Sequence, residues 1–578
     1  MIQTPRIVAR EYGDGSALPD DLHAVTRRVL AARGVTDGRL LETSLKGMIQ
    51  ADTLSGIDTA AKLIHSVMAA GELIMIIGDF DADGATSTAL ALRALKAMGA
   101  SNCTYLVPNR FEYGYGLTPE IVELAESANP ALIITVDNGM SSVAGVERAK
   151  QSGIQVVITD HHLPGRVLPA ADAIVNPNLP GDAFASKALA GVGVIFYVMS
   201  ALRARLRRVG WFEERGIAEP KLANLLDLVA LGTVADVVVL DHNNRRLVAQ
   251  GLARIRAGRC QPGIAALIDA SGRTRARITA SDLAFALGPR LNAAGRMADM
   301  SVGIECLLSD DPDRCAAIAD DLDRLNRERR EVEDTMRDQA FTEIEKNLLA
   351  SVGASLPAAF CVFQDDWHQG VVGIVASRIK DRFHRPAIAF APAEQGTIKG
   401  SARSIAGLHI RDTLDAVATA NPDLLSRFGG HAMAAGLSLE RVAFEPFKNA
   451  FVNEAESRLE ADALERVIAT DGELESGEFS LALARELARV TPWGQGFPEP
   501  RFDGEFRIDD RRVVGGNHAR LVLSPAVGGE TIAAIAFGAA GESWFSEGDS
   551  IRAVYKLDVN DYRGLETLQL VIDYAERI

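Results

Sequence analysis

The sequence lacks several features that would assign it to a membrane, secreted or disulfide-rich class. No uninterrupted apolar run approaches the roughly 20 residues that a membrane span requires. The N-terminal residues MIQTPRIVAREYGDG contain no apolar core of a secretory signal, so we expect a cytoplasmic location. The five cysteines are odd in number and never spaced as CxxC. We therefore expect reduced cysteines that serve packing, with neither a disulfide framework nor a zinc ribbon.

An excess of positive charge is also missing, since the formal net charge is −16. This argues against a wholly basic surface, but arginines gather near residues 203–208, 273–277 and 324–330. Such clusters are either solvated helix faces or the lining of a groove that attracts phosphates. At 578 residues, with 47% hydrophobic and 24% charged residues, the chain is typical of a globular protein of three or four domains.

The central feature of the sequence is LIMIIGDFDADGATSTAL, residues 73–90. An apolar run of strand length ends in three alternating aspartates, Asp79, Asp81 and Asp83, and then resumes as small helix-forming residues. This pattern predicts a strand, a turn and a helix, with the carboxylates at the carboxyl end of the strand. Carboxylates this close repel one another, and a divalent cation would neutralise them. The alternative is an acidic turn that only caps the helix.

The same arrangement recurs further along the chain. Residues 131–142, ALIITVDNGMSS, predict a second strand that ends at Asp137, and residues 154–162, IQVVITDHH, a third that ends at Asp160, His161 and His162. A right-handed parallel sheet would gather these strand ends along one edge. Residues 225–240, LLDLVALGTVADVVVL, follow a helical insertion, and we expect Asp227 and Asp236 to flank a Gly-Thr turn there.

Together these segments supply ligands for two ions of the Mg or Mn kind that share a bridging carboxylate. For Asp236 the alternatives are a salt bridge or a helix cap, because an unpaired buried carboxylate is costly. The candidate ligands are Asp79, Asp81, Asp83, Asp137, His161, His162 and Asp236.

The remaining chain predicts further modules. Residues 316–349 carry an apolar stripe without Gly or Pro, which predicts a long connecting helix. Arg110 lies among aromatic residues in the loop 105–117, where either phosphate binding or plain packing is consistent with the sequence. Glycine-rich turns near Arg403 and His431 are suited to phosphate binding. Five short alternating runs after residue 500 predict a small antiparallel barrel of OB type, which binds either single strands or a protein.

The segments GDFDADG, VDNGMSS, TDHH and TVADVVVL, in this order and spacing, resemble the four signature segments of the DHH phosphoesterase superfamily. The longer strings LVPNRFEYGYGL, LAGVGVIFYVM, GPRLNAAGRM, WHQGVVGIVASRI, KGSARSI and FGGHAMAAGLS resemble the RecJ family, bacterial single-strand-specific 5′→3′ DNA exonucleases, over nearly the full length. The resemblance implies an α/β fold of four parts. These are a parallel-sheet DHH catalytic domain with a helical lead-in (1–315), a connecting helix (316–354), a second α/β domain of DHHA1 type (355–458) and an OB-type barrel (459–578).

The resemblance also implies two-metal hydrolysis of single-stranded DNA to mononucleotides, in recombination and repair, with Mn²⁺ or Mg²⁺ as cofactors. We expect His161 to be a metal ligand, His162 to bind a phosphoryl oxygen, and Asp160 to orient a histidine. The catalytic set would be Asp81, Asp83, Asp137, His161, His162 and Asp236. The implied substrate-binding residues are Arg110, Arg296, Ser401, Arg403 and His431.

One departure concerns Ile77, where pyrophosphate-hydrolysing relatives in the superfamily carry a histidine. We therefore expect two ions of unequal affinity. Two other functions fit parts of the pattern: a phosphodiesterase for dinucleotides or other small molecules, for which the barrel would be surplus, and a replication scaffold without metal. Expected partners are single-stranded DNA, a single-strand-binding protein and a helicase, with no membrane and a monomeric state. The physiological metal and activity on RNA are not determined by the sequence.

Overall fold

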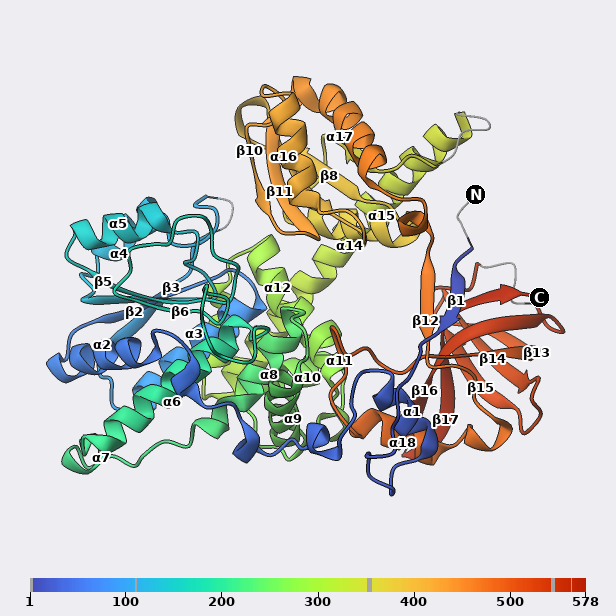
Figure 1. The fold of residues 1–578 in the computed structure, drawn as a ribbon, viewed down its shortest axis with the longest axis horizontal. Coiled ribbons are helices and arrows are strands. Elements are labelled where there is room, and N and C mark those ends of the chain that lie inside the picture. Colours follow the sequence, from blue (N-terminus) through green and yellow to red (C-terminus); the bar gives the residue numbers. More distant parts are fainter. Residues whose placement is uncertain (1–3, 110–111, 351–355, 542–545, 563) are drawn as a thin grey trace. The chain divides into compact units, whose positions relative to one another are not determined.

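The computed structural model describes residues 4–109, 112–350, 356–541, 546–562 and 564–578 (Figure 1). The chain forms two compact units. One unit contains residues 9–325 and 470–578, and the other contains residues 326–469 with the N-terminal residues up to Val8. The division falls between Leu325 and Asn326, inside the long helix α14 (Pro312–Ala350). Each unit is described in turn.

The first unit is built on a fully parallel sheet with strand order β3-β2-β4-β5-β6. Helices α4 and α5 cover one face of the sheet, and α2, α3 and α6 pack on the other (Figure 1). The strands are β2 (Ile74–Gly78), β3 (Cys103–Leu106), β4 (Leu132–Val136), β5 (Gln155–Thr159) and β6 (Ala173–Val175). The helices are α2 (Ile57–Ala70), α3 (Ala82–Ala97), α4 (Pro119–Glu126), α5 (Val143–Gln151) and α6 (Gly191–Arg208).

Strand β2 is apolar at every position up to Gly78 because it is buried on both faces, as is normal for a central parallel strand. Helix α3 begins directly afterwards because the Asp81 side chain caps it, accepting hydrogen bonds from the backbone N–H groups of Asp83 and Gly84 at 3.0 Å each. The helix therefore begins at Ala82, and Asp83 lies in its first turn rather than on the strand.

A helical region follows the sheet. It comprises α7 (Trp211–Glu214), α8 (Leu226–Ala235), α9 (His242–Arg256), α10 (Pro262–Ala270), α11 (Ala280–Asp282), a π-helical turn (Leu283–Leu287), α12 (Gly288–Met297) and α13 (Ser301–Leu308). The lead-in was expected to be mostly helical, but from residue 4 onward it forms only α1 (Ala24–Ala31), three short 3₁₀ turns and strand β1 (Arg6–Ala9). Strand β1 pairs with β12 (Val467–Thr470).

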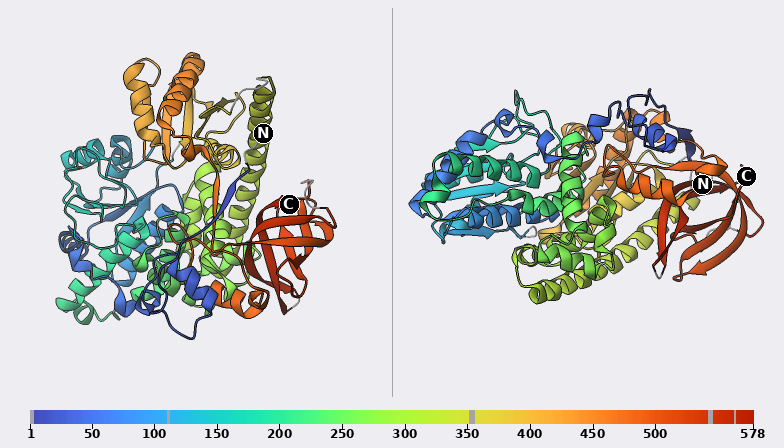
Figure 2. Two further views of the ribbon diagram at one scale, coloured as in Figure 1. Left: turned by 45° about the vertical axis from the view of Figure 1, so that its right-hand side comes forward. Right: turned by 90° about the horizontal axis from the view of Figure 1, so that it is seen from below.

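The C-terminal part of the first unit is a closed five-stranded barrel in the order β13-β14-β15-β17-β16, drawn in red in Figure 2. Its strands are β13 (Phe502–Val514), β14 (His518–Pro525), β15 (Ile532–Ala536), β16 (Ser550–Tyr562) and β17 (Leu565–Arg577), preceded by helix α18 (Leu481–Arg489). The five strands match the predicted runs. The barrel is not wholly antiparallel, because β15 and β17 close it as a parallel pair.

The second unit contains a mixed sheet in the order β10-β11-β9-β8-β7, in which only β7 and β8 are parallel among the described strands. Its elements are β7 (Phe360–Phe363), α15 (Val372–Phe383), β8 (Ala387–Pro392), β9 (Thr397–Arg403), α16 (Ile410–Ala420), β10 (Arg427–Gly430), β11 (Ala434–Glu440) and α17 (Phe444–Arg458). The predicted long helix is α14, with 39 residues.

No described helix is long and apolar enough to cross a membrane. All five cysteines are free thiols. The predicted α/β class, with a parallel sheet, a second mixed domain and a barrel, is confirmed.

Candidate metal centre

Three neighbouring strands deliver acidic residues to one edge of the parallel sheet. Strands β2, β4 and β5 lie side by side, and their last residues Gly78, Val136 and Thr159 are in register. The residues that follow them are Asp79, Asp137 and Asp160. Since parallel strands all end at the same edge, three carboxylates from distant segments converge there.

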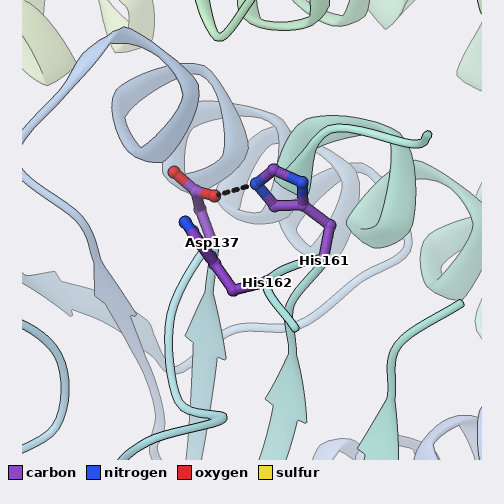
Figure 3. A group of neighbouring side chains, drawn as sticks. All are labelled: Asp137, His161 and His162. Atoms are coloured by element: carbon purple, nitrogen blue, oxygen red, sulfur yellow. Dashed lines mark ion pairs between the residues drawn. The ribbon is translucent and has the colours of Figure 1, made fainter. Parts of the chain in front are cut away.

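The structure brings all seven predicted ligands into one neighbourhood. Three overlapping groups each place their ligand atoms within 4.8 Å of one another: Asp79, Asp81 and Asp137; Asp83, His161 and Asp236; Asp137, His161 and His162. The His161 Nε2 atom lies 3.1 Å from Asp137 Oδ1 and 3.4 Å from Asp236 Oδ2. Figure 3 shows the Asp137 carboxylate directed at the His161 ring. Asp137 and His161 each belong to two of the three groups, so these two side chains link the groups together.

Burial makes this concentration of carboxylates electrostatically costly. Burial and the charges of Asp83 and Asp81 raise the pKa of Asp137 well above its ordinary value. Burial and the charge of Asp81 raise the pKa of Asp83 to about 7, and burial with Asp83 and Asp81 also raises the pKa of Asp236. These groups keep their negative charge readily only when a cation is close.

The donor set fits hard divalent cations. Carboxylate oxygens with one or two imidazoles and no thiolate are typical ligands of Mn²⁺ and Mg²⁺. In addition, the buried Oδ1 of Asp137 lies 3.1 Å from His161 Nε2 but accepts no hydrogen bond from the residues that the structure describes. A buried acceptor of this kind is costly unless something binds it, and it faces the ligand cluster.

Asp83 also anchors a second helix. Its Oδ2 accepts a hydrogen bond from Gly191 N at 2.6 Å, and its Oδ1 accepts one from Val192 N at 2.9 Å. These N–H groups belong to the first turn of α6, where no intrahelical acceptor exists. Asp83 therefore combines a place in the ligand cluster with the fixing of α6 to α3.

Asp160 organises the turn that carries both histidines. Its carboxylate accepts hydrogen bonds from the backbone of His161 at 2.7 Å, His162 at 3.0 Å and Met140 at 2.9 Å, and it lies 2.7 Å from His162 Nδ1. Burial alone would raise the pKa of Asp160, but the hydrogen bond and charge of His162 outweigh it, so this pKa is lowered. In turn, although burial opposes it, Asp160 raises the pKa of His162 to about 8. The side chain oriented by Asp160 is thus that of His162.

The predicted Gly-Thr turn between Asp227 and Asp236 is wrong. Residues 226–235 form the buried helix α8, and Asp236 lies at its C-terminal end. Gly232 allows α8 to approach α3, since a Cβ there would lie 2.3 Å from Thr86 Oγ1 and 2.8 Å from Asp83 Oδ1. Here the glycine marks close helix packing rather than a turn.

Two residues at the centre have left-handed backbone conformations. Asp137 has φ of 62° and Val237, which follows Asp236, has φ of 61°. Aspartate tolerates this region, but it is unusual for a β-branched residue. Strain at such positions persists only when the surrounding structure imposes it.

The predicted substrate-binding residues lie in different parts of the chain. Arg110 lies outside the described residues. Arg296 is in the last turn of α12, next to Gly295, where a Cβ would lie 2.0 Å from the carbonyl oxygen of Phe80. Close packing of Gly295 thus brings Arg296 next to the first aspartate turn.

The other three predicted contacts belong to the second unit. Ser401 and Arg403 lie on β9 and face the first turn of α15, since a Cβ on Gly373 would meet Arg403 Nη2 at 3.0 Å and Ser401 Oγ at 3.4 Å. His431 follows β10, and its N–H donates to Ala434 O at 2.8 Å. Ser401 and Arg403 therefore meet at a helix N-terminus, which is a suitable environment for an anion.

Sequence reasoning missed Tyr115 and Asn292. The Tyr115 hydroxyl lies 3.2 Å from Asp137 O and 3.3 Å from His162 Nδ1, and its ring contacts those of Phe80 and His162 edge to face. Asn292 Oδ1 accepts a hydrogen bond from Ala82 N at 2.8 Å, which ties α12 to the start of α3. Both residues lie inside strings that were conspicuous in the sequence, but only their contacts reveal these roles.

Three domain models match consecutive parts of the chain. They are the DHH family N-terminal domain over residues 73–233, the DHHA1 domain over 354–461 and the RecJ OB domain over 470–574. The single-stranded-DNA-specific exonuclease RecJ of Dickeya dadantii is 55% identical over 560 residues, 96% of each chain. The chain belongs to the RecJ family. The RecJ of Escherichia coli is 51% identical over 574 residues, 99% of each chain.

Solved RecJ structures agree with the fold. RecJ from Thermus thermophilus in complex with Mn²⁺ matches with a TM-score of 0.77 at 29% identity, over 99% of this chain and 79% of that one. The same protein in complex with Mg²⁺ matches with a TM-score of 0.71 at 27% identity, over 99% and 78%. The RecJ membership predicted from the sequence is confirmed, and the two ions are those that the donor set favours.

Proposed function

We propose that this chain is a metal-dependent 5′→3′ exonuclease that degrades single-stranded DNA to mononucleotides in DNA recombination and repair. The observation that carries the proposal is the convergence of seven acidic and imidazole ligands at one sheet edge, in a chain of RecJ membership. Asp79, Asp81 and Asp137 would hold one cation, and Asp83, His161 and Asp236, with Asp137 as the bridge, would hold the other. When bound, divalent cations lower the pKa of water and neutralise developing charge on phosphate and leaving oxygens.

The surrounding residues would place the phosphodiester. Because Asp160 occupies His162 Nδ1, we propose that the Nε2 N–H of His162 donates to a phosphoryl oxygen. The Tyr115 hydroxyl, 3.3 Å from His162 Nδ1, would restrict the rotation of the ring. Burial and nearby carboxylates raise the pKa of Tyr115, so its hydroxyl keeps its proton.

We propose that the terminal nucleotide and its 5′ phosphate are bound by Arg110 and Arg296 together with Ser401, Arg403 and His431. Arginine binds phosphate through a fork of N–H donors, and a helix N-terminus adds backbone donors. The OB-type barrel would bind the DNA strand that leads to the metal centre, by stacking against its bases and by attracting its charged backbone.

The wider setting of the activity is part of the same proposal. We infer that the protein acts as a cytoplasmic monomer, receives its strand from a single-strand-binding protein and a helicase, and has domain limits at residues 315, 354 and 458. The ion held by Asp79 and Asp81 would bind less tightly than the other, because Ile77 offers no ligand.

The test is a time course on 5′-labelled and 3′-labelled single and double strands with Mn²⁺, Mg²⁺ or chelator. We expect mononucleotides released from the 5′ end of single strands only, and no product with chelator. His161→Ala and Asp81→Ala should abolish cleavage and retain DNA binding. Activity in both variants would refute the metal assignment, and a preference for a dinucleotide over a long strand would favour a small-molecule phosphodiesterase.

A further inference from the structure

A turn near the barrel lies directly against the segment that carries a candidate metal ligand. The turn is formed by residues 493–497, between α18 and β13, and the segment by residues 236–241, between α8 and α9. We propose that this turn is a positioning element that fixes Asp236 for cation binding. The inference rests on the proposed metal centre.

Backbone groups of residues 239 and 240 form hydrogen bonds with the turn on one side and with α9 on the other. The N–H of Leu240 donates to Gln495 O at 2.8 Å, and its carbonyl accepts from Arg245 Nη1 at 3.0 Å. The carbonyl of Val239 accepts from Asn244 Nδ2 at 2.9 Å. Of these partners, Arg245 and Asn244 are on α9, so the turn supplies the contact from the barrel side.

The turn is held by backbone hydrogen bonds and ring contacts. Gly494 and Phe497 exchange two backbone hydrogen bonds of 2.9 and 3.0 Å. The rings of Trp493 and Phe497 stack with their centroids 5.2 Å apart, and Trp493 Nε1 donates to Leu487 O at 2.7 Å on α18. The Arg245 guanidinium lies 4.1 Å from the centre of the Phe497 ring.

The contact has no room for an added methyl group. A Cβ on Gly494 would lie 2.7 Å from Leu240 Cδ1, and because Leu240 is only 2% exposed, its side chain can move only by displacing its packed neighbours. A Cβ on Gly496, which has φ of 69°, would lie 2.7 Å from Val239 Cγ1. Any side chain at these glycines therefore pushes on residues 239 and 240.

Displacement of Val239 and Leu240 reaches Asp236 through only two intervening residues, Val237 and Val238. Val237 has a left-handed backbone conformation, which is unfavourable for a β-branched residue and persists only while the surrounding structure imposes it. Asp236 then loses its position beside His161 Nε2, now 3.4 Å away. Residues that orient a ligand in this indirect way typically change metal affinity about 10- to 100-fold.

The experiment compares Gly494→Ala with Gly477→Ala in the full-length protein. Gly477 also lacks a left-handed φ, but a Cβ there meets no atom within 4 Å. Mn²⁺ affinity is measured by calorimetry and electron paramagnetic resonance, alongside DNA affinity in chelator and exonuclease rate against Mn²⁺ concentration. We expect about 10-fold weaker Mn²⁺ binding for Gly494→Ala, unchanged DNA affinity, and wild-type behaviour for Gly477→Ala.

A second pair decides the question if Gly494→Ala does not fold. Gly496→Ala is compared with Gly472→Ala, which has φ of 81° but no atom within 4 Å of an added Cβ. Val239→Ala should restore Mn²⁺ affinity to Gly496→Ala, because it removes the atom that the new methyl meets. Folded Gly494→Ala or Gly496→Ala protein with wild-type Mn²⁺ affinity overturns the inference. Failure of wild-type protein to bind Mn²⁺ would instead refute the proposed metal centre.

Discussion

Arg33 and Asp471, 438 residues apart in sequence, form a two-pronged ion pair that joins the N-terminal lead-in to the segment leading into the barrel. The two guanidinium nitrogens lie 2.7 and 2.9 Å from the two carboxylate oxygens. Both side chains are almost fully buried, at 2% and 0% exposure. The pair therefore adds a buried ionic link to the backbone contacts that join these two parts of the chain.

Removing Arg33 should destabilise this region strongly. We expect Arg33→Ala to lower the free energy of unfolding by about 3–5 kcal/mol, because Asp471 would keep a buried charge with a weaker partner. Denaturant unfolding at neutral pH measures the loss. Arg27→Ala is the control, since its pair with Asp20 is longer, at 3.4 Å, and Asp20 is exposed, so the cost should stay below about 1 kcal/mol. Equal effects of the two substitutions would contradict the prediction.

Replacing the carboxylate of Asp137 should have opposite effects on stability and on function. We expect Asp137→Asn to lose Mn²⁺ binding and to lower the exonuclease rate more than about 100-fold. In chelator the same variant should melt at a higher temperature, by about 1 °C for each kcal/mol of carboxylate repulsion removed, since the unit that contains Asp137 is large. Asparagine also tolerates the left-handed backbone of residue 137.

Differential scanning calorimetry with and without Mn²⁺ checks this prediction, with the exposed Asp52→Asn as control. A chelator-treated Asp137→Asn protein that melts below the wild type would show that the carboxylates do not oppose folding.

The Tyr115 hydroxyl should affect turnover without affecting metal binding. Tyr115→Phe removes the contacts with Asp137 O and His162 while keeping the ring. We expect Tyr115→Phe to lower kcat about 2- to 10-fold, which is the effect of losing one hydrogen bond. Its Mn²⁺ affinity should be unchanged. Steady-state kinetics and a Mn²⁺ titration measure both quantities, and Tyr12→Phe, at an exposed tyrosine, is the matched control. A weaker Mn²⁺ affinity would instead place Tyr115 among the residues that shape the metal site.

Asp227 should make stability depend on pH. Burial raises its pKa to about 6, although the N–H groups of Gln261 and Leu228 donate to it at 2.6 and 3.0 Å. The pKa of Asp227 is higher in the folded state than in the unfolded state. Its contribution to the free energy of unfolding is therefore complete below about pH 4 and is lost as the pH rises through about 6. The loss amounts to about 3 kcal/mol, at about 1.4 kcal/mol for each pKa unit.

Asp227→Asn removes the titration of this one carboxyl and leaves every other titratable group in place. When both proteins are unfolded in chelator between pH 4 and 8, the free energy of unfolding of the wild type should therefore fall relative to that of Asp227→Asn. Parallel pH curves would refute the pKa assigned to Asp227.

Much of the centre could be predicted from local patterns. Apolar runs of strand length that end in Asp79, Asp137 and Asp160 indicate buried parallel strands, whose carboxyl ends always meet at one edge. The alternating pattern after residue 500 likewise identified all five barrel strands, because side chains on a strand alternate between core and solvent. The direction of β15 against β17 was not visible, because it depends on how the chain returns to close the barrel.

The sequence by itself thus determined the composition of the candidate ligand set, because strand ends and their acidic residues are encoded within a few neighbouring positions. Only the tertiary structure decided that Asp236 comes from the end of a helix, that Asp83 also holds the start of α6, and that residues 493–497 press on the segment behind Asp236. The last two relationships depend on contacts between residues more than 100 positions apart, for which no local periodicity exists.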